Sequence, residues 1–155
     1  MLDRRAIDDF LAQRRLAVVG VTGRKGDFAT TMVGELREHG YDVFPVGRSG
    51  PDGTFPALAD VPGPVDGVVV MVARDAAPAA VKEAAAAGIR RVWLFKGIGK
   101  GACGDAAVAA CREHDMAVVE GACPLMFLEP VRSVHRFHRG IRRLRGVYPK
   151  AVSAV

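Results

Sequence analysis

The chain has 155 residues, of which 50% are hydrophobic and 25% are charged. That length suits one domain, and that apolar content can fill a core of two or three layers. No apolar run approaches the roughly 20 residues that cross a bilayer, and Met1–Arg5 lacks the apolar core of a signal peptide. We therefore expect a cytoplasmic protein that does not enter a membrane.

The three cysteines show no CxxC spacing, which argues against a disulfide framework or a zinc site. The net charge of +5 is unevenly spread. From Val131 onward there are seven Lys or Arg residues and no acid, whereas residues 1–130 hold fifteen Lys or Arg against 17 acids. Because the basic character belongs to the end of the chain, nucleic acid is not the expected partner of the whole surface.

Short apolar runs alternate with amphipathic segments along the chain. The predicted strands are 16–21, 41–46, 67–73, 91–95 and 116–120. The predicted helices are 3–13, 28–39, 75–87, 105–114 and 131–145, with one further helical turn at 57–60. Asp3 and Asp75 are the expected N-caps of the first and third helices. The order predicts an α/β fold: a Rossmann-like, doubly wound, parallel five-stranded sheet with helices on both faces.

The last helix is predicted as a separate unit of residues 131–155 beside a domain of residues 1–130. Val134, Phe137, Ile141 and Leu144 form an apolar stripe on it, and arginines occupy its other faces. This basic amphipathic helix is expected to pack on the body or on a partner, such as a second copy in a homodimer. His135 and His138 lie three residues apart without a Cys or carboxylate at helical spacing, so no metal site is predicted.

The run Leu16–Asp27 carries the strongest functional signal. An uncharged apolar strand leads into a loop with glycines at Gly20, Gly23 and Gly26 and with Thr22, Arg24 and Lys25 between them, just before a helix. Bare backbone N–H groups, a hydroxyl and two cations at a helix N-terminus suit a phosphate group. The spacing is neither GxGxxG nor a P-loop, so Walker-type ATP hydrolysis is not expected.

The end of the second strand narrows the ligand. Dinucleotide-binding folds that select NAD place an acid here, on the ribose hydroxyls. This chain has Gly47-Arg48 instead. A cation at that position suits a ribose that carries a phosphate, as in NADP or coenzyme A.

The segments 18–26, 40–46, 57–66 and 87–93 together resemble the small stand-alone CoA-binding domain proteins of bacteria. The first of them is also similar to the CoA-binding loop of the succinyl-CoA synthetase alpha subunit. The resemblance covers about residues 12–128, and it implies a Rossmann-type fold with coenzyme A as ligand. The chain departs from the family at Gly47-Arg48, where many members have Asn-Pro, and at Phe95-Lys96, where many have a Gln.

The resemblance also implies roles for individual residues. Thr22, Gly23 and Arg24 would contact the pyrophosphate or the start of pantetheine, and Arg48 would lie near the adenosine 3′-phosphate. Val72, Ala73 and Arg74, after the third strand, would border the adenine or ribose. From the residues themselves, Lys96 and Lys100, which flank glycines such as Gly97 after the fourth strand, are candidates for a second phosphate or carboxylate contact.

These observations favour a non-catalytic carrier, sensor or subunit that binds CoA or acyl-CoA, and no catalytic residue is assigned. The ligase reaction of the synthetase is not expected, because it needs a second domain and a partner chain. Two alternatives stay open. One is an NADP-dependent oxidoreductase, and the other is a nucleotide-sensing regulatory protein that acts through its basic C-terminal helix.

Overall fold

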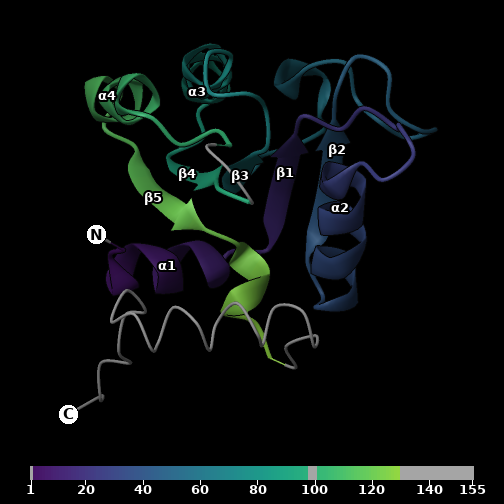
Figure 1. Cartoon of the computed structure of the whole chain (residues 1–155), viewed down its shortest axis with the longest axis horizontal. Helices are drawn as coiled ribbons and strands as arrows, with labels where there is room; N and C mark the ends of the chain where they lie inside the picture. Colours follow the sequence, from purple (N-terminus) through teal and green to yellow (C-terminus); the bar gives the residue numbers. More distant parts are fainter. Residues whose placement is uncertain (1, 98–100, 130–155) are drawn as a thin grey trace.

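The computed structural model describes residues 2–97 and 101–129, and these form a single α/β layer structure (Figure 1). The strands are β1 (Arg15–Val19), β2 (Asp42–Val46), β3 (Gly67–Val70), β4 (Arg91–Phe95) and β5 (Ala117–Ala122). The α-helices are α1 (Arg4–Leu11), α2 (Phe28–Glu38), α3 (Ala77–Ala86) and α4 (Asp105–Glu113), and the 3-10 turns are η1 (Leu58–Asp60) and η2 (Pro124–Met126). The predicted helix at 131–145 lies outside the described residues.

All five strands are parallel and lie in the order β2-β1-β3-β4-β5. Figure 1 shows α3 and α4 above the sheet and α1 and α2 on its other side. The predicted doubly wound parallel sheet is therefore confirmed. No helix within residues 2–97 and 101–129 is both long and apolar enough to cross a membrane.

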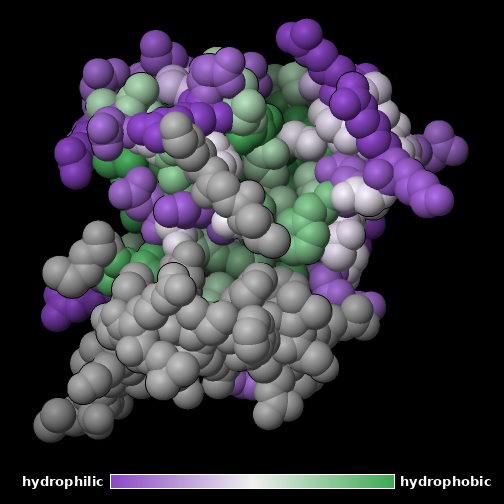
Figure 2. Space-filling model, in the orientation of Figure 1, coloured by the Kyte–Doolittle hydropathy of each residue, from purple (hydrophilic) through white to green (hydrophobic). Residues whose placement is uncertain are grey.

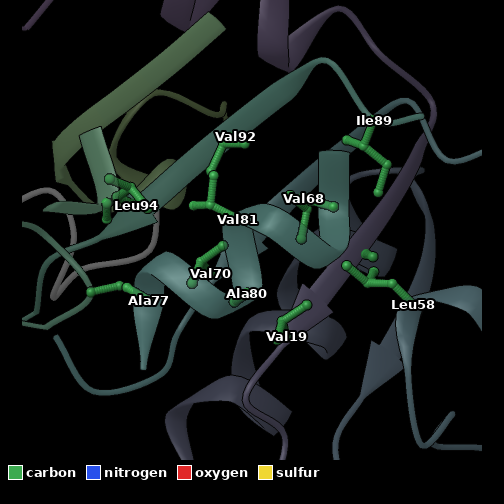
Figure 3. Packing of buried hydrophobic residues seen from close by; sticks show 14 of the residues in the cluster. Val19, Leu58, Val68, Val70, Ala77, Ala80, Val81, Ile89, Val92 and Leu94 are labelled. Atoms are coloured by element: carbon green, nitrogen blue, oxygen red, sulfur yellow. The ribbon is translucent and has the colours of Figure 1, made fainter. Parts of the chain in front are cut away.

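The core is divided by the sheet into two clusters, because successive side chains of a strand point to opposite faces. On the α3–α4 side, Val68, Val70 and Val92 pack against small helix residues such as Ala80 and Val81 (Figure 3). On the α1–α2 side the residues are larger. They include Ile7, Phe10, Met32, Leu36 and Trp93, each 0–1% exposed.

The ends of several elements differ from the prediction for backbone reasons. Strand β1 stops at Val19 because Gly20 has φ +110°, which turns the chain out of the sheet, and the N–H groups of Gly20 and Val21 both donate to the Val46 carbonyl.

Asp3 caps α1 as predicted. Asp75 does not cap α3. The helix begins at Ala77 with Ala76 as N-cap, since the N–H groups of Ala76 and Ala77 already donate to the Ala73 carbonyl in the preceding turn.

Candidate functional site

The strand order sets where a ligand can enter the sheet. Strand β1 connects outward to β2 on one side, and β3 continues the sheet on the other, so the direction of winding reverses between β1 and β3. In doubly wound sheets the ligand crevice opens beyond the carboxyl ends of the strands at this switch point. The segments that meet there are the loop after β1 (residues 20–27), the loop after β2 (47–57) and the turn after β3 (71–76).

Three glycines let these loops approach one another. A Cβ atom on Gly20 would lie 2.7 Å from the Met71 carbonyl oxygen, and one on Gly47 would overlap the Val21 carbonyl oxygen. A Cβ on Gly23, whose φ is +67°, would lie 3.2 Å from the Ser49 carbonyl oxygen. The loop after β1 is therefore seated between the exits of β2 and β3, which brings Thr22 and Gly23 beside the segment that carries Arg48.

The carboxylate of Asp27 organises the loop after β1. Its Oδ2 atom accepts hydrogen bonds from the N–H groups of Thr22 (2.7 Å) and Gly23 (3.2 Å) and from the Thr30 hydroxyl (3.1 Å). Its Oδ1 atom accepts the Ala29 N–H at 3.0 Å, as an N-cap residue does. One side chain thus joins the loop to the first turn of α2.

These bonds correct one expectation from the sequence. The N–H groups of Thr22 and Gly23 are not bare, because a carboxylate already occupies them. Partial burial alone would raise the pKa of Asp27. Hydrogen bonds from the Thr22 and Ala29 N–H groups and from the Thr30 and Thr22 hydroxyls outweigh that effect and hold the pKa below its usual value of 3.8. Asp27 is therefore ionised at neutral pH.

Five cationic side chains follow the strands at this edge: Arg24, Lys25, Arg48, Arg74 and Lys96. All five residues are exposed. Within residues 2–97 and 101–129, none of these side chains forms a hydrogen bond or an ion pair. Two other arginines, Arg4 and Arg91, pair with aspartates, whereas at this edge five cations follow four neighbouring strands. We call the five residues the edge cations.

The other predicted site residues lie at the same edge. Ala73 is exposed and Val72 half-buried after β3, while Gly26 is exposed in the loop after β1 and Gly97 after β4. A Cβ atom on Gly104 would lie 2.6 Å from the Arg74 Nε atom, so the Arg74 side chain reaches across to the start of α4. Lys100 lies outside the described residues. Figure 2 shows hydrophobic residues in a central recess of this face, between hydrophilic groups over the loops after β1 and β2 and over α3 and α4.

The Cys111 thiol is poorly suited to covalent chemistry. Burial, with a smaller contribution from the Glu120 charge, raises the pKa of the Cys111 thiol to about 11. That thiol is protonated at neutral pH and shielded from solvent, so it is a poor nucleophile. No group of three His, Cys, Asp or Glu side chains that could hold a metal ion occurs within residues 2–97 and 101–129.

A family model described as a CoA binding domain matches residues 14–129. The chain belongs to the CoA-binding domain family. A search of curated proteins gave no match.

Solved structures share the fold of this CoA-binding domain. A hypothetical protein from Pyrococcus horikoshii OT3 superposes with a TM-score of 0.68 at 22% identity, over 80% of this chain and 87% of that chain. The cell-free ID.343 protein from Thermus thermophilus gives 0.65 at 24% identity, over 89% and 98%. The dinucleotide-forming acetyl-coenzyme A synthetase 1 of Ca. Korarchaeum cryptofilum gives 0.61 at 20% identity, over 72% of this chain but 27% of that chain.

Sequence reasoning missed two features of this CoA-binding domain. Asp27 was not identified as the residue that holds the loop, although an Asp directly before an amphipathic helix is a standard N-cap signal. The aromatic pair Phe28–Phe95 was also missed, with its ring centroids 5.5 Å apart. No sequence pattern pairs residues from α2 and β4, because their contact depends on the strand order.

Proposed function

We propose that this CoA-binding domain binds CoA or acyl-CoA at the carboxyl edge of its sheet and acts as a non-catalytic carrier, sensor or subunit. The observation that carries the proposal is the cluster of edge cations without partners in the described part of a chain of this family. CoA bears a pyrophosphate and a 3′-phosphate, so its adenosine end is strongly anionic. Exposed arginines and lysines from neighbouring loops suit several phosphate groups at once.

In this arrangement Arg48 pairs with the 3′-phosphate and Arg24 and Lys25 neutralise the pyrophosphate. Gly26 adds a backbone N–H group in the same loop. Thr22 and Gly23 serve as the frame of the loop, since Asp27 holds their N–H groups. Val72, Ala73 and Arg74 border the adenine and ribose beyond β3, and Lys96 and Gly97 lie beyond β4.

The proposal is tested by titrating the protein with CoA, dephospho-CoA, NADP and NAD. CoA at a free concentration of about 100 times its Kd should stabilise the fold by about 2.7 kcal/mol. For a domain of this size that corresponds to a rise in Tm of roughly 5–10 °C. Stabilisation by NADP without any by CoA would instead support the oxidoreductase alternative, which also places a phosphate on Arg48.

The Arg48→Ala variant tests the assigned end of the ligand. Loss of one charge-assisted contact should weaken CoA about tenfold, or about 1.4 kcal/mol, and leave dephospho-CoA nearly unchanged. Arg5→Ala, on the exposed surface of α1, removes the same charge elsewhere and serves as the control. Equal losses of affinity for CoA and dephospho-CoA in calorimetry would show that Arg48 does not bind the 3′-phosphate.

A further inference from the structure

The rings of Phe28 and Phe95 form an aromatic pair at the carboxyl edge of the sheet. Their centroids are 5.5 Å apart, with 33° between the ring planes. Phe28 is the first residue of α2 and Phe95 the last residue of β4. Phe28 is 38% exposed. Among residues 2–97 and 101–129 it is the one large hydrophobic residue that is exposed. The exposed part of the Phe28 ring follows the loop after β1 directly, so a ligand bound at this loop can reach it.

Phe95, at the end of β4, lies at the opposite end of the site from Arg48. Strand β4 is three steps from β2 in the sheet, and at about 4.8 Å per step this is roughly 14 Å. Met71, which follows β3, is half-buried and packs against the same apolar cluster as Phe95. Apolar side chains therefore lie at the β3–β4 part of the edge, together with the exposed cations Arg74 after β3 and Lys96 after β4.

The backbone after β4 passes close to the Phe95 ring. A Cβ atom at Gly97 would lie 3.0 Å from the Phe95 Cε1 atom. The chain thus passes the edge of that ring at a residue without a side chain. The glycine permits this close passage, and Phe28 is the more exposed ring of the pair.

We propose that the Phe28–Phe95 pair receives the acyl group of a thioester, so that the preferred ligand is an acyl-CoA rather than free CoA. This rests on the proposed function. The two ends of CoA match the two ends of the site: the phosphates are at one end of the ligand and the thiol is at the other. With the phosphates held at the loops after β1 and β2, the pantetheine arm crosses β3 and brings the thioester to β4. The two rings then bury the acyl methylenes.

The test is the dependence of affinity on acyl chain length. Calorimetric titrations with CoA, acetyl-CoA, butyryl-CoA and hexanoyl-CoA should show about a threefold to fourfold gain for each methylene that becomes buried. The Phe28→Ala variant should lose this gain, and Phe28→Leu should keep part of it. Adenosine 3′,5′-bisphosphate, which lacks the pantetheine arm, should bind all three proteins equally.

A matched control removes an aromatic ring elsewhere. Phe55 pairs with Phe44 on the other face of the sheet, at 6.2 Å between ring centroids, so Phe55→Leu should retain the chain-length dependence. Folding of every variant is checked by the fluorescence of Trp93, which is fully buried. Phe28→Leu keeps the test valid if Phe28→Ala fails to fold.

The outcomes separate the two proposals. If CoA binds but longer acyl chains gain nothing, or if Phe28→Ala keeps the gain, the acyl assignment is wrong and the proposed function stands. If the Phe28 variants also bind adenosine 3′,5′-bisphosphate more weakly, the ring pair stabilises the loop after β1 and does not contact the acyl group. That result also overturns the assignment. If neither CoA nor any acyl-CoA binds, the proposed function itself fails.

Discussion

The loop after β1 and the loop after β4 have similar compositions, but they join their helices differently. Each is rich in glycine and carries two cations: Arg24 and Lys25 in the first, Lys96 and Lys100 in the second. The first loop is joined to its helix by Asp27, which accepts hydrogen bonds from both the loop and α2. The second leads into α4 through Gly104, which makes no side-chain cap.

The loop after β1 therefore depends on a side-chain acceptor as well as on its glycines. Glycine permits the close approaches at Gly20 and Gly47, but it also increases the entropy that folding must overcome. Hydrogen bonds to one carboxylate offset that cost in the loop after β1. The same carboxylate places a negative charge next to Arg24 and Lys25, so the loop gains order at some loss of positive potential.

The largest expected effect comes from the close contact between the loops after β1 and β2. In Gly47→Ala the new Cβ would overlap the Val21 carbonyl oxygen, and backbone must move to relieve it. We expect a loss of about 3 kcal/mol or more, and a fall in Tm of roughly 6–12 °C. Thermal unfolding followed by circular dichroism measures this.

The matched substitution in the loop after β4 is Gly97→Ala. Among residues 2–97 and 101–129, the Cβ would meet the edge of the Phe95 ring, at 3.0 Å, and a ring can shift by a few tenths of an ångström. The stability should change by no more than about 0.5 kcal/mol. Similar losses of stability for Gly47→Ala and Gly97→Ala would show that the two loops are packed equally tightly.

The second effect tests Asp27. Asp27→Ala removes the N-cap of α2 and the acceptor for the Thr22 and Gly23 N–H groups. We expect a loss of about 2 kcal/mol, which denaturation in urea will measure. Asp105→Ala, in the first turn of α4 where the N-cap is Gly104, is the control and should cost only a few tenths of a kcal/mol.

The same residue gives a pH dependence with a defined sign. Because the folded-state pKa of Asp27 is below 3.8, its carboxylate stabilises the fold fully above the unfolded-state pKa. That contribution disappears as the pH falls through the folded-state pKa. The stability difference between the native protein and Asp27→Asn should therefore be constant from pH 8 to pH 5 and shrink below about pH 4. A constant difference down to pH 3 would contradict this role.

The smallest effect adds a cap to the loop that lacks one. Gly104 has φ 176°, an extended conformation that any residue adopts, and Gly104→Ser supplies a hydroxyl for the first turn of α4. We expect a gain of a few tenths of a kcal/mol, measured as a shift of the urea midpoint. A loss above about 1 kcal/mol would mean that Arg74, whose Nε atom lies 2.6 Å from the new Cβ position, is held rigidly against Gly104.

The strands and helices could be predicted because their signals are local. Uncharged apolar runs mark β1 and β3, and Asp3 and the 57–60 turn were correctly placed as well. The limits of β2 and β4 were predicted to within one residue, but the end of β1 could not be predicted, because it lies where Gly20 leaves the sheet to approach Met71. Asp27 and Asp75 illustrate the same limit. Both precede a helix, but only Asp27 caps one, since a turn after β3 already uses the N–H groups that Asp75 would accept.

The site divides in the same way. The sequence could locate the loops that follow each strand, because parallel strands end at one edge. The bonds of Asp27 to Thr22 and Gly23 depend on the folded path of the loop, and the contact of Phe28 with Phe95 depends on β4 lying beyond β3. These are properties of the tertiary structure, so they appear only once the strand order is known.

The exposed edge cations have a consequence for the kinetics of encounter. Exposed charges that form no ion pair extend their field into solvent over about 8 Å at physiological ionic strength. A polyanion that diffuses past the carboxyl edge is drawn toward it before any contact forms. The association rate constant should therefore fall as salt is added, whereas the apolar contact at Phe28 and Phe95 acts after arrival and governs how long the ligand stays.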